Sequence, residues 1–289
     1  MPSDPGTPPV FVGGSGRSGT TIAGELIGAS AHYALVPIEL RFHVDGGGLA
    51  QLARGETSLD AFQTAMTRKW YQRPPAASGA SRGVQVVIDR PELEQAFGRL
   101  RDTYPQDPWR SCGTFLEDVV DPLRRTQGAA SWVEMTPPNA KAIHTLSRML
   151  PTAQFVHMVR DGRDVAHSVA RRSWGPDDVP GALIWWGKQM LAIHRSISDS
   201  DASRVHTVRL ESLVGPHREV AYDQLADFLG LQGDATMRTF FDERMSTGRA
   251  RPGSWQRGLD PDEAERVELL YRKQLARLES QGVSFPSVL

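Results

Sequence analysis

Cysteine is nearly absent from this chain of 289 residues: Cys112 is the single example. One thiol excludes an intramolecular disulfide framework and any metal site built from several cysteines. A reducing, cytoplasmic environment is therefore the expectation. Long apolar stretches are missing as well, since no run reaches the roughly 18 residues that a membrane-spanning helix needs. The sequence thus predicts a protein that does not cross a membrane.

The chain also lacks an excess of charge of either sign. It has 33 Lys and Arg residues against 34 Asp and Glu residues, and its formal net charge is −1. This balance gives no general attraction to nucleic acid or to an anionic membrane surface, so neither is expected as a partner. Residues 1–9 have no basic start and no long apolar core, which argues against a secretory signal. We expect a short disordered lead-in there.

Short apolar runs alternate with amphipathic stretches along most of the chain. Strands are expected from residue 10 and at residues 131–134, 154–159 and 205–210, and a further short apolar run at residues 33–38 is broken by Pro37. Strands that alternate with helices are typical of a parallel sheet covered on both faces. We therefore predict a single α/β domain over residues 1–289, with a P-loop-like central parallel sheet and helices on both faces. Residues 46–130 are predicted to form a mainly helical insertion.

The most informative segment is the glycine-rich turn after the first strand, Gly13-Gly14-Ser15-Gly16-Arg17-Ser18-Gly19-Thr20-Thr21. Glycines let backbone N–H groups point inward, and the following helix adds unpaired donors, so the turn is a candidate anion cradle. The phosphate loop of nucleoside triphosphate enzymes has the pattern GxxxxGK[ST]. Gly14 and Gly19 have this spacing, but Thr20 replaces the lysine. The cation of the loop is Arg17 instead.

A second cationic segment follows the strand at 154–159 and reads Arg160-Asp161-Gly162-Arg163-Asp164-Val165-Ala166-His167-Ser168. Arg160 stands at the carboxyl end of the strand, and Ser168 about one turn into the next helix. A guanidinium and a hydroxyl are natural donors to a second phosphate. Ligands of parallel sheets bind at the carboxyl ends of the strands, where both segments are expected. A surface cluster of salt bridges within the segment is the alternative explanation.

Together the two segments resemble the phosphate-binding motifs of sulfotransferases that use 3′-phosphoadenosine 5′-phosphosulfate (PAPS). The turn around Arg17 is similar to their 5′-phosphosulfate loop, and the segment from Arg160 to Ser168 is similar to their 3′-phosphate motif. Residues 146–163 resemble the protein-tyrosine sulfotransferase branch, as does the arginine in the loop. The resemblance covers about residues 10–45, 131–172 and 205–260, and leaves 46–130 unmatched.

This resemblance implies a reaction and a site. PAPS would be the donor and PAP the product, without a metal. Arg17 would contact the transferring sulfuryl group, and Glu39, in a Glu39-Leu40-Arg41 segment like that of the tyrosine branch, would be the general base. Residues 249–258 resemble the loop that closes over the donor. The implied donor-binding residues are Gly14, Ser15, Gly16, Arg17, Ser18, Gly19, Thr20, Thr21, Arg160, Ser168, Arg251, Ser254 and Arg257.

One position departs from the family pattern. Related enzymes place a lysine, which stabilises the bridging oxygen, two residues before the proline of a Lys-x-Pro turn, and Met135 aligns with it here. Methionine carries no charge and donates no hydrogen bond. Either Arg17 acts alone, or Lys141 or Thr136 substitutes. His43, close to Glu39 in the sequence, is an alternative base.

No motif specifies the acceptor. We expect the hydroxyl of a small molecule, such as a natural product, a phenol or a glycan. The unmatched insertion, residues 46–130, is expected to bind it, with Trp70 and Tyr71 as candidate lining residues. Two other functions stay open: a P-loop nucleotide kinase or NTPase-like enzyme, which the missing lysine disfavours, and an inactive PAP-binding module, for which Met135 is the hint. The oligomeric state is also open, with a homodimer as one option.

Overall fold

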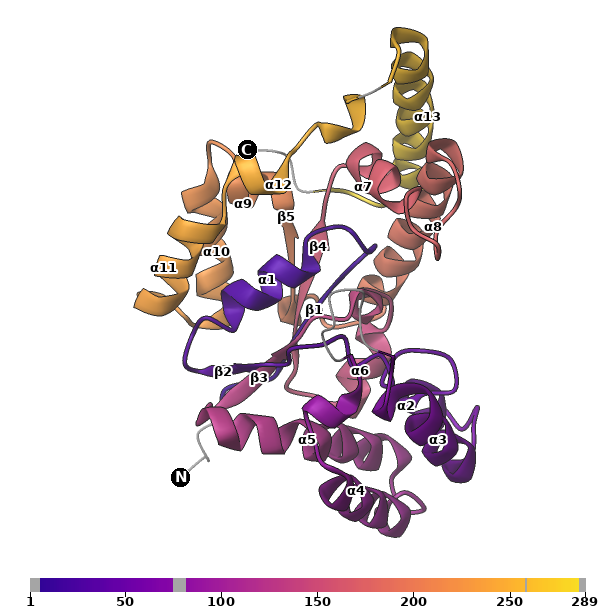
Figure 1. Ribbon diagram of the computed structural model, residues 1–289, viewed down its shortest axis with the longest axis vertical. Coiled ribbons are helices and arrows are strands. Elements are labelled where there is room, and N and C mark those ends of the chain that lie inside the picture. The colour runs from indigo at the N-terminus through magenta and orange to yellow at the C-terminus, as the bar shows by residue number, and fades with distance from the viewer. Residues whose placement is uncertain (1–5, 75–81, 258, 286–289) are drawn as a thin grey trace.

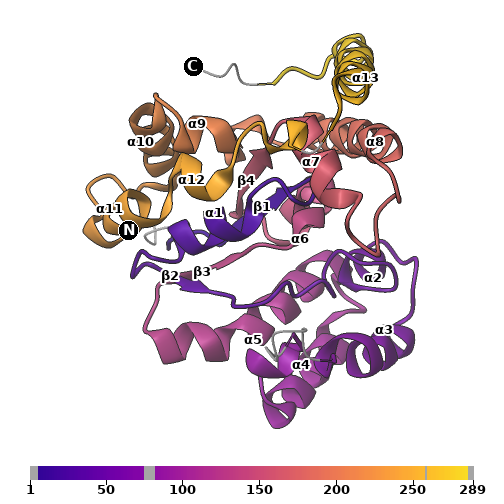
Figure 2. The same ribbon diagram turned by 45° about the horizontal axis from the view of Figure 1, so that its top comes forward.

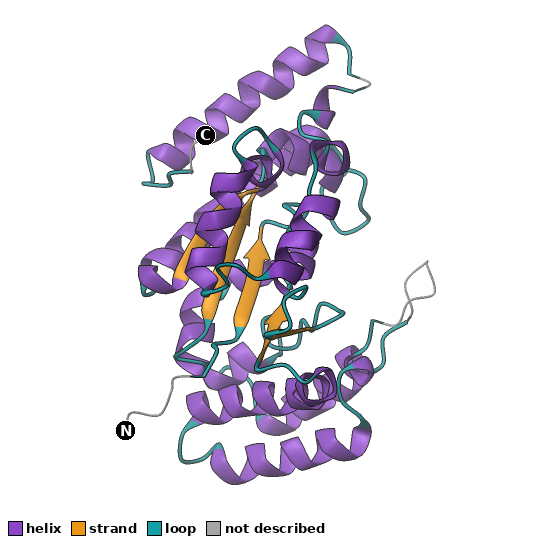
Figure 3. Cartoon of the chain, turned by 90° about the vertical axis from the view of Figure 1, so that its left-hand side faces the viewer, coloured by secondary structure: helices purple, strands orange, loops and turns teal. Residues whose placement is uncertain are grey.

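The computed structural model describes residues 6–74, 82–257 and 259–285, so the first five residues of the predicted lead-in lie outside the description. In the described part, five parallel strands form one sheet in the order β2-β3-β1-β4-β5 (Figure 3). The strands are β1 (Val10–Gly14), β2 (Tyr33–Leu35), β3 (Ser131–Glu134), β4 (Gln154–Val159) and β5 (Val205–Arg209). The predicted α/β fold with a central parallel sheet is confirmed.

Helices bury both faces of the sheet. One face packs against α5 (Pro108–Gln127) and α6 (Ile143–Met149), and the other against α1 (Thr20–Ile27), α10 (Arg218–Leu229) and α11 (Ala235–Arg244). Side chains alternate between the faces, as the two-residue period of a strand requires. Phe11 and Phe155, from neighbouring strands, stack on the first face with ring centroids 5.6 Å apart. Val12 and Val156 belong to the core of the second face. Burial on both sides explains the continuous apolar runs of these strands.

The insertion at residues 46–130 forms a helical layer at the β2 side of the sheet, at the bottom of Figures 1 and 2. Its described elements are α2 (Leu49–Ala53), α3 (Leu59–Ala65), the π-helix η1 (Met66–Tyr71), the 3-10 helix η2 (Val84–Val86), α4 (Arg90–Thr103) and α5. Phe62, Phe97 and Phe115 pack together at its centre, with ring centroids 4.9 to 5.9 Å apart. The prediction of a mainly helical insertion is confirmed.

A third core holds the other end of the molecule together. The remaining elements are η3 (Pro137–Lys141), α7 (Gly162–Val169), α8 (Val179–Ser198), η4 (Ala202–Arg204), α9 (Leu210–Val214), α12 (Thr247–Ala250), η5 (Ser254–Gln256) and α13 (Pro261–Glu279). Trp186 of α8 packs against Tyr271 of α13, with ring centroids 5.6 Å apart. Helix α13 lies at the opposite end from α4 (Figure 2). No helix among the described residues combines the length and the apolar character that spanning a membrane requires.

Two strands end before the apolar runs of the sequence do. β2 ends at Leu35, within the run at residues 33–38, because Pro37 has no backbone N–H to donate to a neighbouring strand. β5 ends at Arg209 instead of residue 210, because Leu210 begins α9. After β3, the 3-10 turn η3 starts with Pro137 and Pro138 and precedes α6.

Candidate active site

The glycine-rich turn between β1 and α1 depends on close packing that other residues would prevent. A Cβ atom on Gly13 would lie 2.3 Å from the backbone N of Ala140, and one on Gly14 would lie 2.3 Å from Ser18 Oγ. Gly19 has a φ angle of 95°, in the left-handed region that glycine enters without steric cost. These glycines bring the turn against the end of the sheet and direct the chain into α1.

Helix α1 has an uncapped N-terminus. Its N-cap residue is Gly19, so no side chain accepts a hydrogen bond from the first turn, and that turn has no acidic residue. The first N–H groups of a helix have no partner within the helix, and the helix dipole is positive at this end. Thr20 and Thr21 line the cavity beside these groups. The turn and the helix end can therefore hold an anion.

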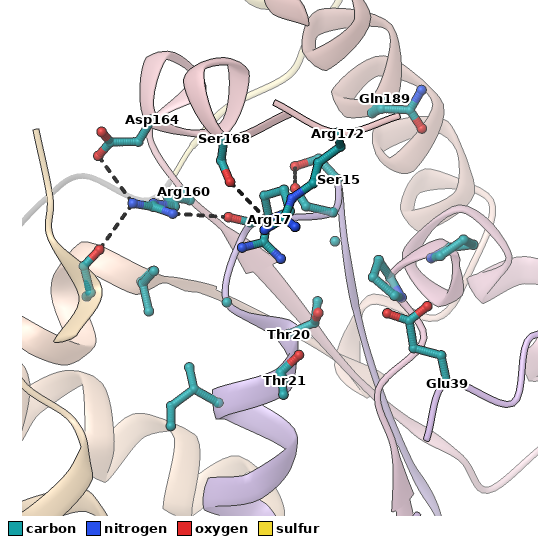
Figure 4. Close-up of a pocket in the computed structure, with 18 of the residues that line it drawn as sticks. Ser15, Arg17, Thr20, Thr21, Glu39, Arg160, Asp164, Ser168, Arg172 and Gln189 are labelled. Carbon is teal, nitrogen blue, oxygen red and sulfur yellow. Dashed lines mark hydrogen bonds and ion pairs between the residues drawn. The ribbon is translucent and has the colours of Figure 1, made fainter. Parts of the chain in front are cut away.

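Arg17 connects this turn to α7. Its Nε donates a hydrogen bond to Ser168 Oγ at 3.0 Å, across 151 positions of the sequence (Figure 4). Burial lowers the pKa of the Arg17 guanidinium, and the positive charges of Arg172 and Arg160 lower it further, while Glu39 raises it. The positive charges of Arg17, Arg160 and Arg172 therefore act on one another within the cavity. An oxyanion placed there would relieve their repulsion.

Arg160 lies beside the turn at the end of β4. It donates hydrogen bonds to the backbone oxygens of Arg17 at 3.3 Å and Ala250 at 3.1 Å, and its ion pair with Asp164 spans 3.6 Å. Its Nε is buried and has no partner in the described part of the chain. A buried donor without a partner is costly, so Arg160 retains capacity to bind a ligand. The salt-bridge alternative accounts for the Asp164 pair but not for this free donor.

Asp164 fixes the segment that follows α12. Its side chain is buried and accepts hydrogen bonds from the backbone N–H of Gly253 at 2.8 Å, from that of Trp255 at 2.9 Å, and from Ser254 Oγ at 3.1 Å. The segment therefore lies against α7 and closes one wall of the cavity. The sequence interpretation gave Asp164 no such role, because its partners lie about 90 positions away.

Glu39 lies on the other side of Arg17 from Arg160 (Figure 4). Its side chain is 41% exposed, lines the cavity and accepts a hydrogen bond from Arg41 Nη1 at 3.0 Å. Arg41 also donates two hydrogen bonds to Asp45, at 2.9 and 3.2 Å. Arg41 therefore holds two carboxylates, one on each side. Glu39 keeps one oxygen without a protein partner among the described residues.

A buried carboxylate at the end of β3 fixes the backbone between Glu39 and Arg41. Glu134 is fully buried and accepts hydrogen bonds from the backbone N–H of Leu40 at 3.1 Å and from Asn139 Nδ2 at 2.6 Å. It also accepts from the backbone N–H and the hydroxyl of Thr136. Burial alone would raise the pKa of Glu134, but His43, Asn139 and Thr136 together lower it. Sequence reasoning missed Glu134 because the contact that links it to Glu39, with the backbone of Leu40, comes from a distant segment, although Thr136 and Asn139 follow Glu134 closely in the chain.

This network removes two of the predicted alternatives. His43 is fully buried, lies 2.7 Å from Asn139 Oδ1 and does not line the cavity, so it is not placed to act as the base. Thr136 is also fully buried, and its hydroxyl donates to Glu134. Met135 packs against α1, with its Sδ 3.1 Å from where a Cβ of Gly24 would lie. Of the candidates to replace the missing lysine, only Lys141 lines the cavity.

The cavity has a volume of about 1650 Å³ and an uneven charge. Its lining has ten Lys and Arg side chains against four Asp and Glu side chains: Arg17, Arg41, Lys69, Arg73, Lys141, Arg160, Arg171, Arg172, Arg244 and Arg251 against Glu25, Glu39, Asp45 and Asp164. The chain as a whole is close to neutral. Such a concentration of positive charge in a concave site attracts anionic ligands.

Most of the predicted site residues meet in this cavity. It is lined by Glu39, Gly14, Ser15, Gly16, Arg17, Gly19, Thr20, Thr21, Arg160, Ser168, Arg251 and Ser254. Ser18 is not among them: it is fully buried beneath the turn, with a hydroxyl that has no partner in the described residues. Arg257 lines a smaller hollow of about 530 Å³ together with Arg251. Trp70 lines the main cavity, whereas Tyr71 is buried outside it.

Comparison with known proteins identifies the family to which this chain belongs. The sequence profile of the sulfotransferase family matches residues 8–235, which is most of the chain. The chain therefore belongs to the sulfotransferase family, and the protein is a sulfotransferase. No curated protein matches the sequence. The finer likeness to the protein-tyrosine branch stays a prediction.

Two solved structures share the fold at low identity. The sulfotransferase domain from the curacin biosynthetic pathway is 16% identical with a TM-score of 0.53, and the match covers 96% of this chain and 99% of that one. The sulfotransferase domain from the Synechococcus PCC 7002 olefin synthase is 19% identical with a TM-score of 0.50, and the match covers 99% and 98%. At such identities the likeness establishes the architecture and says nothing about the acceptor.

Proposed function

We propose that this sulfotransferase uses PAPS as its donor and transfers the sulfuryl group to the hydroxyl of a small molecule. One observation carries the proposal: two adjoining sets of anion-binding groups, from segments far apart in the sequence, open into the same cavity. The first is the turn around Arg17 with the N-terminus of α1, and the second is Arg160 with Ser168. A ligand with phosphate groups at both ends of a nucleoside would use both sets.

The charge of the cavity fits this donor. The part of the lining contributed by the turn, α1, residues 160–172 and residues 244–251 has six cationic side chains and two carboxylates: Arg17, Arg160, Arg171, Arg172, Arg244 and Arg251 against Glu25 and Asp164. PAPS carries about four negative charges at neutral pH, of which its 3′-phosphate supplies nearly two. The surplus of positive charge at this end therefore matches the donor. The unpartnered Nε of Arg160 is consistent with the same assignment.

Different walls of the cavity suit different parts of the donor. The uncapped N–H groups of α1 and the Arg17 guanidinium would hold the phosphosulfate, whereas Arg160, Ser168 and Arg251 would hold the 3′-phosphate. The lining of the cavity also includes the apolar side chains of Ile22, Leu210, Val214 and Met245. A flat purine ring would bury its faces against such side chains.

The residues then divide the chemistry of transfer between them. Glu39 would accept the proton of the acceptor hydroxyl while the acceptor oxygen forms its bond to sulfur. The bond between sulfur and the bridging oxygen breaks, and that oxygen leaves with PAP. Arg17 would stabilise the charge that develops on the bridging and sulfuryl oxygens. Holding both reactants in line supplies the rest of the acceleration.

We assign the role of the missing lysine to Arg17 alone. Thr136 is committed to Glu134. The charges that act on Lys141 are those of Asp45 and Arg41, whereas the charges that act on Arg17 are those of Arg172, Arg160 and Glu39. Lys141 therefore belongs to the Arg41 side of the cavity rather than to the turn. This division leaves Arg17 as the cation at the reacting group.

Exchange of Glu39 for glutamine tests the assignment of the base. Glu39→Gln should leave the affinity for PAP within about twofold and lower kcat by 100-fold or more, because glutamine cannot accept a proton. The measurements are PAP titration by calorimetry and transfer of labelled sulfate from PAPS to the best substrate in a panel of phenols, sugars and alcohols. Glu56→Gln is a matched control, because Glu56 is also paired with an arginine but lies outside the cavity.

The possible outcomes separate the proposed function from its rivals. An unchanged kcat in Glu39→Gln would remove Glu39 from the role of base. PAP binding without sulfation of any acceptor in the panel would indicate the inactive PAP-binding module. Absence of PAP binding would contradict the donor assignment itself.

A further inference from the structure

The end of the cavity beyond Glu39 has its own surplus of positive charge. Four cations line it, from three segments far apart in the sequence: Arg41, Lys69, Arg73 and Lys141. The carboxylates that line this end are Glu39 and Asp45. On the proposed function, this end faces the acceptor, because Arg41 is paired with Glu39, and Glu39 lies on the other side of Arg17 from Arg160 (Figure 4). The excess of positive charge at this end of the cavity therefore bears on the binding of the acceptor and not on that of the donor.

Two of the four cations, Arg41 and Lys69, already have interaction partners within the protein. Arg41 donates to Glu39 at 3.0 Å and to Asp45 at 2.9 Å, so it accounts for both carboxylates. Lys69 donates to the backbone oxygen of Gly46 at 3.2 Å and lies 4.6 Å from the centroid of the Trp70 ring. Its ammonium group thus has partners within the protein. The unexplained positive charge is that of Arg73 and Lys141.

Arg73 and Lys141 have no ion pair or hydrogen-bond partner among the described residues. The charges of Arg41, Glu39 and Asp45 all act on Arg73, and those of Asp45 and Arg41 act on Lys141, so both cations lie around one group. Partial burial is the largest cause that lowers the pKa of each, and the positive charge of Arg41 (with that of Arg82 for Arg73) lowers it further, while Asp45, and for Arg73 also Glu39, raises it. Cations that are partly desolvated and close to another cation are destabilised unless an anion joins them.

We propose that the acceptor is itself anionic, and that Arg73 and Lys141 bind an oxyanion that it carries in addition to its hydroxyl. The proposal rests on the proposed function, since PAPS accounts for the positive surplus at the other end of the cavity but not for this one. A carboxylate, or a sulfate or phosphate ester, has the planar or tetrahedral oxygens that a guanidinium binds with two parallel hydrogen bonds. The ammonium group of Lys141 would add a further charge-assisted hydrogen bond.

The pair would also select the acceptor. A neutral analogue of the same shape would leave both cations unpaired in a partly dry site, which is more costly than a lost contact alone. The anchored oxyanion would fix the distance between the charged group and the hydroxyl that reaches Glu39. Specificity would then follow from the spacing of these two groups on the acceptor.

The test uses matched pairs of acceptors in which a carboxylate is replaced by a carboxamide, such as 4-hydroxyphenylacetate with its amide and glucuronate with glucuronamide. The protein is first saturated with PAP, and the affinity for each compound is then measured by calorimetry. We expect at least one anionic member to bind about tenfold or more tightly than its amide. Arg73→Gln and Lys141→Gln should each abolish most of that preference and leave PAP affinity unchanged.

Arg68→Gln is the matched control, because Arg68 is exposed on helix η1, which ends just before Arg73 in the chain, and does not line the cavity. It removes one positive charge and should keep the preference for the anion. Equal or weaker binding of the anionic members, no binding of any of them to the PAP complex, or a preference that persists in both Arg73→Gln and Lys141→Gln would overturn the proposal. Failure of the proposed function would appear earlier and separately, as absence of PAP binding in the first titration.

Discussion

Three arginines have a backbone conformation that arginine rarely adopts. Arg17, Arg41 and Arg251 have φ angles of 60°, 63° and 49°, and they are the described non-glycine residues with positive φ. All three line the cavity. The left-handed region costs a residue with a Cβ about 1 kcal/mol. Strain of this kind is retained where the direction of a side chain matters, which agrees with a site that needs its guanidinium groups in fixed positions.

Arg251 allows this strain to be separated from binding. Arg251→Ala and Arg251→Gly both remove the guanidinium, so both should weaken PAP binding about tenfold. Glycine also removes the strain, so Arg251→Gly should be about 1 kcal/mol more stable than Arg251→Ala. Chemical denaturation and PAP titration of the two variants make the comparison. Equal stability of the pair would show that the φ angle of Arg251 is not strained.

At the scale of single residues, the sequence allowed the residues that face the ligand to be predicted. It did not allow the residues that position them to be predicted. Arg17, Arg160 and Ser168 could be proposed because their motifs are local and have recognisable chemistry. Asp164 and Glu134 could not, because their roles arise from partners on other segments: Gly253 and Leu40 lie 89 and 94 positions away. A buried carboxylate with several donors has no local sequence signature.

The ends of the strands determine the site at the scale of secondary structure. β1 is followed by the Arg17 turn and β4 by Arg160, while Glu134 is the last residue of β3. β1 lies between β3 and β4 in the sheet, so the three carboxyl ends are neighbours. The connection from β2 to α2, which contains Glu39, is tied to them through the hydrogen bond from Leu40 to Glu134. This bond couples the position of Glu39 to the sheet.

Loss of the Glu134 carboxylate should therefore destabilise the protein in a pH-dependent way. Glu134→Gln should lower the free energy of unfolding by about 3 kcal/mol at pH 7, because glutamine leaves buried donors without an acceptor. The folded-state pKa of Glu134 lies below its usual value of 4.5. The stabilisation by the carboxylate is thus complete above pH 4.5 and is lost as the pH falls through the folded-state pKa.

Denaturation of both proteins between pH 3 and pH 8 tests this expectation. The difference in stability between wild type and Glu134→Gln should be constant near neutrality and should shrink in acid. A difference that stays the same down to pH 3, or that grows in acid, would mean that Glu134 is not held as a carboxylate.

Element boundaries were predictable where apolar patterns were strong. β3 and β4 were expected at the residues that they occupy, since both are buried runs with clear ends. For the insertion, the sequence predicted a mainly helical segment but not the bounds of its individual helices. Their packing depends on Phe62, Phe97 and Phe115 meeting across the layer, which no local pattern specifies. Consequently the acceptor side of the cavity, with Arg73, could not be assembled from the sequence.

For the whole molecule, the distribution of charge matters more than its sum. The net charge of −1 gives no indication of an anionic ligand, yet ten cationic and four acidic side chains line one cavity. The balancing acidic residues lie elsewhere on the chain. Composition alone therefore excluded a general affinity for polyanions but could not reveal a local one. Two motifs in the right order identified the family, and the fold explains why segments so far apart act together.

The central claim is that the cavity binds a nucleotide with phosphates on both its 3′ and 5′ sides, and competitive calorimetry with PAP, 5′-AMP and ATP–Mg²⁺ tests it most directly. We expect PAP to bind about 100-fold more tightly than 5′-AMP, because Arg160, Ser168 and Arg251 add charge-assisted hydrogen bonds to the 3′-phosphate. ATP–Mg²⁺ should bind more weakly than PAP, since Thr20 replaces the lysine that a triphosphate requires. Binding of ATP–Mg²⁺ as tight as that of PAP, or equal affinities for PAP and 5′-AMP, would contradict the account.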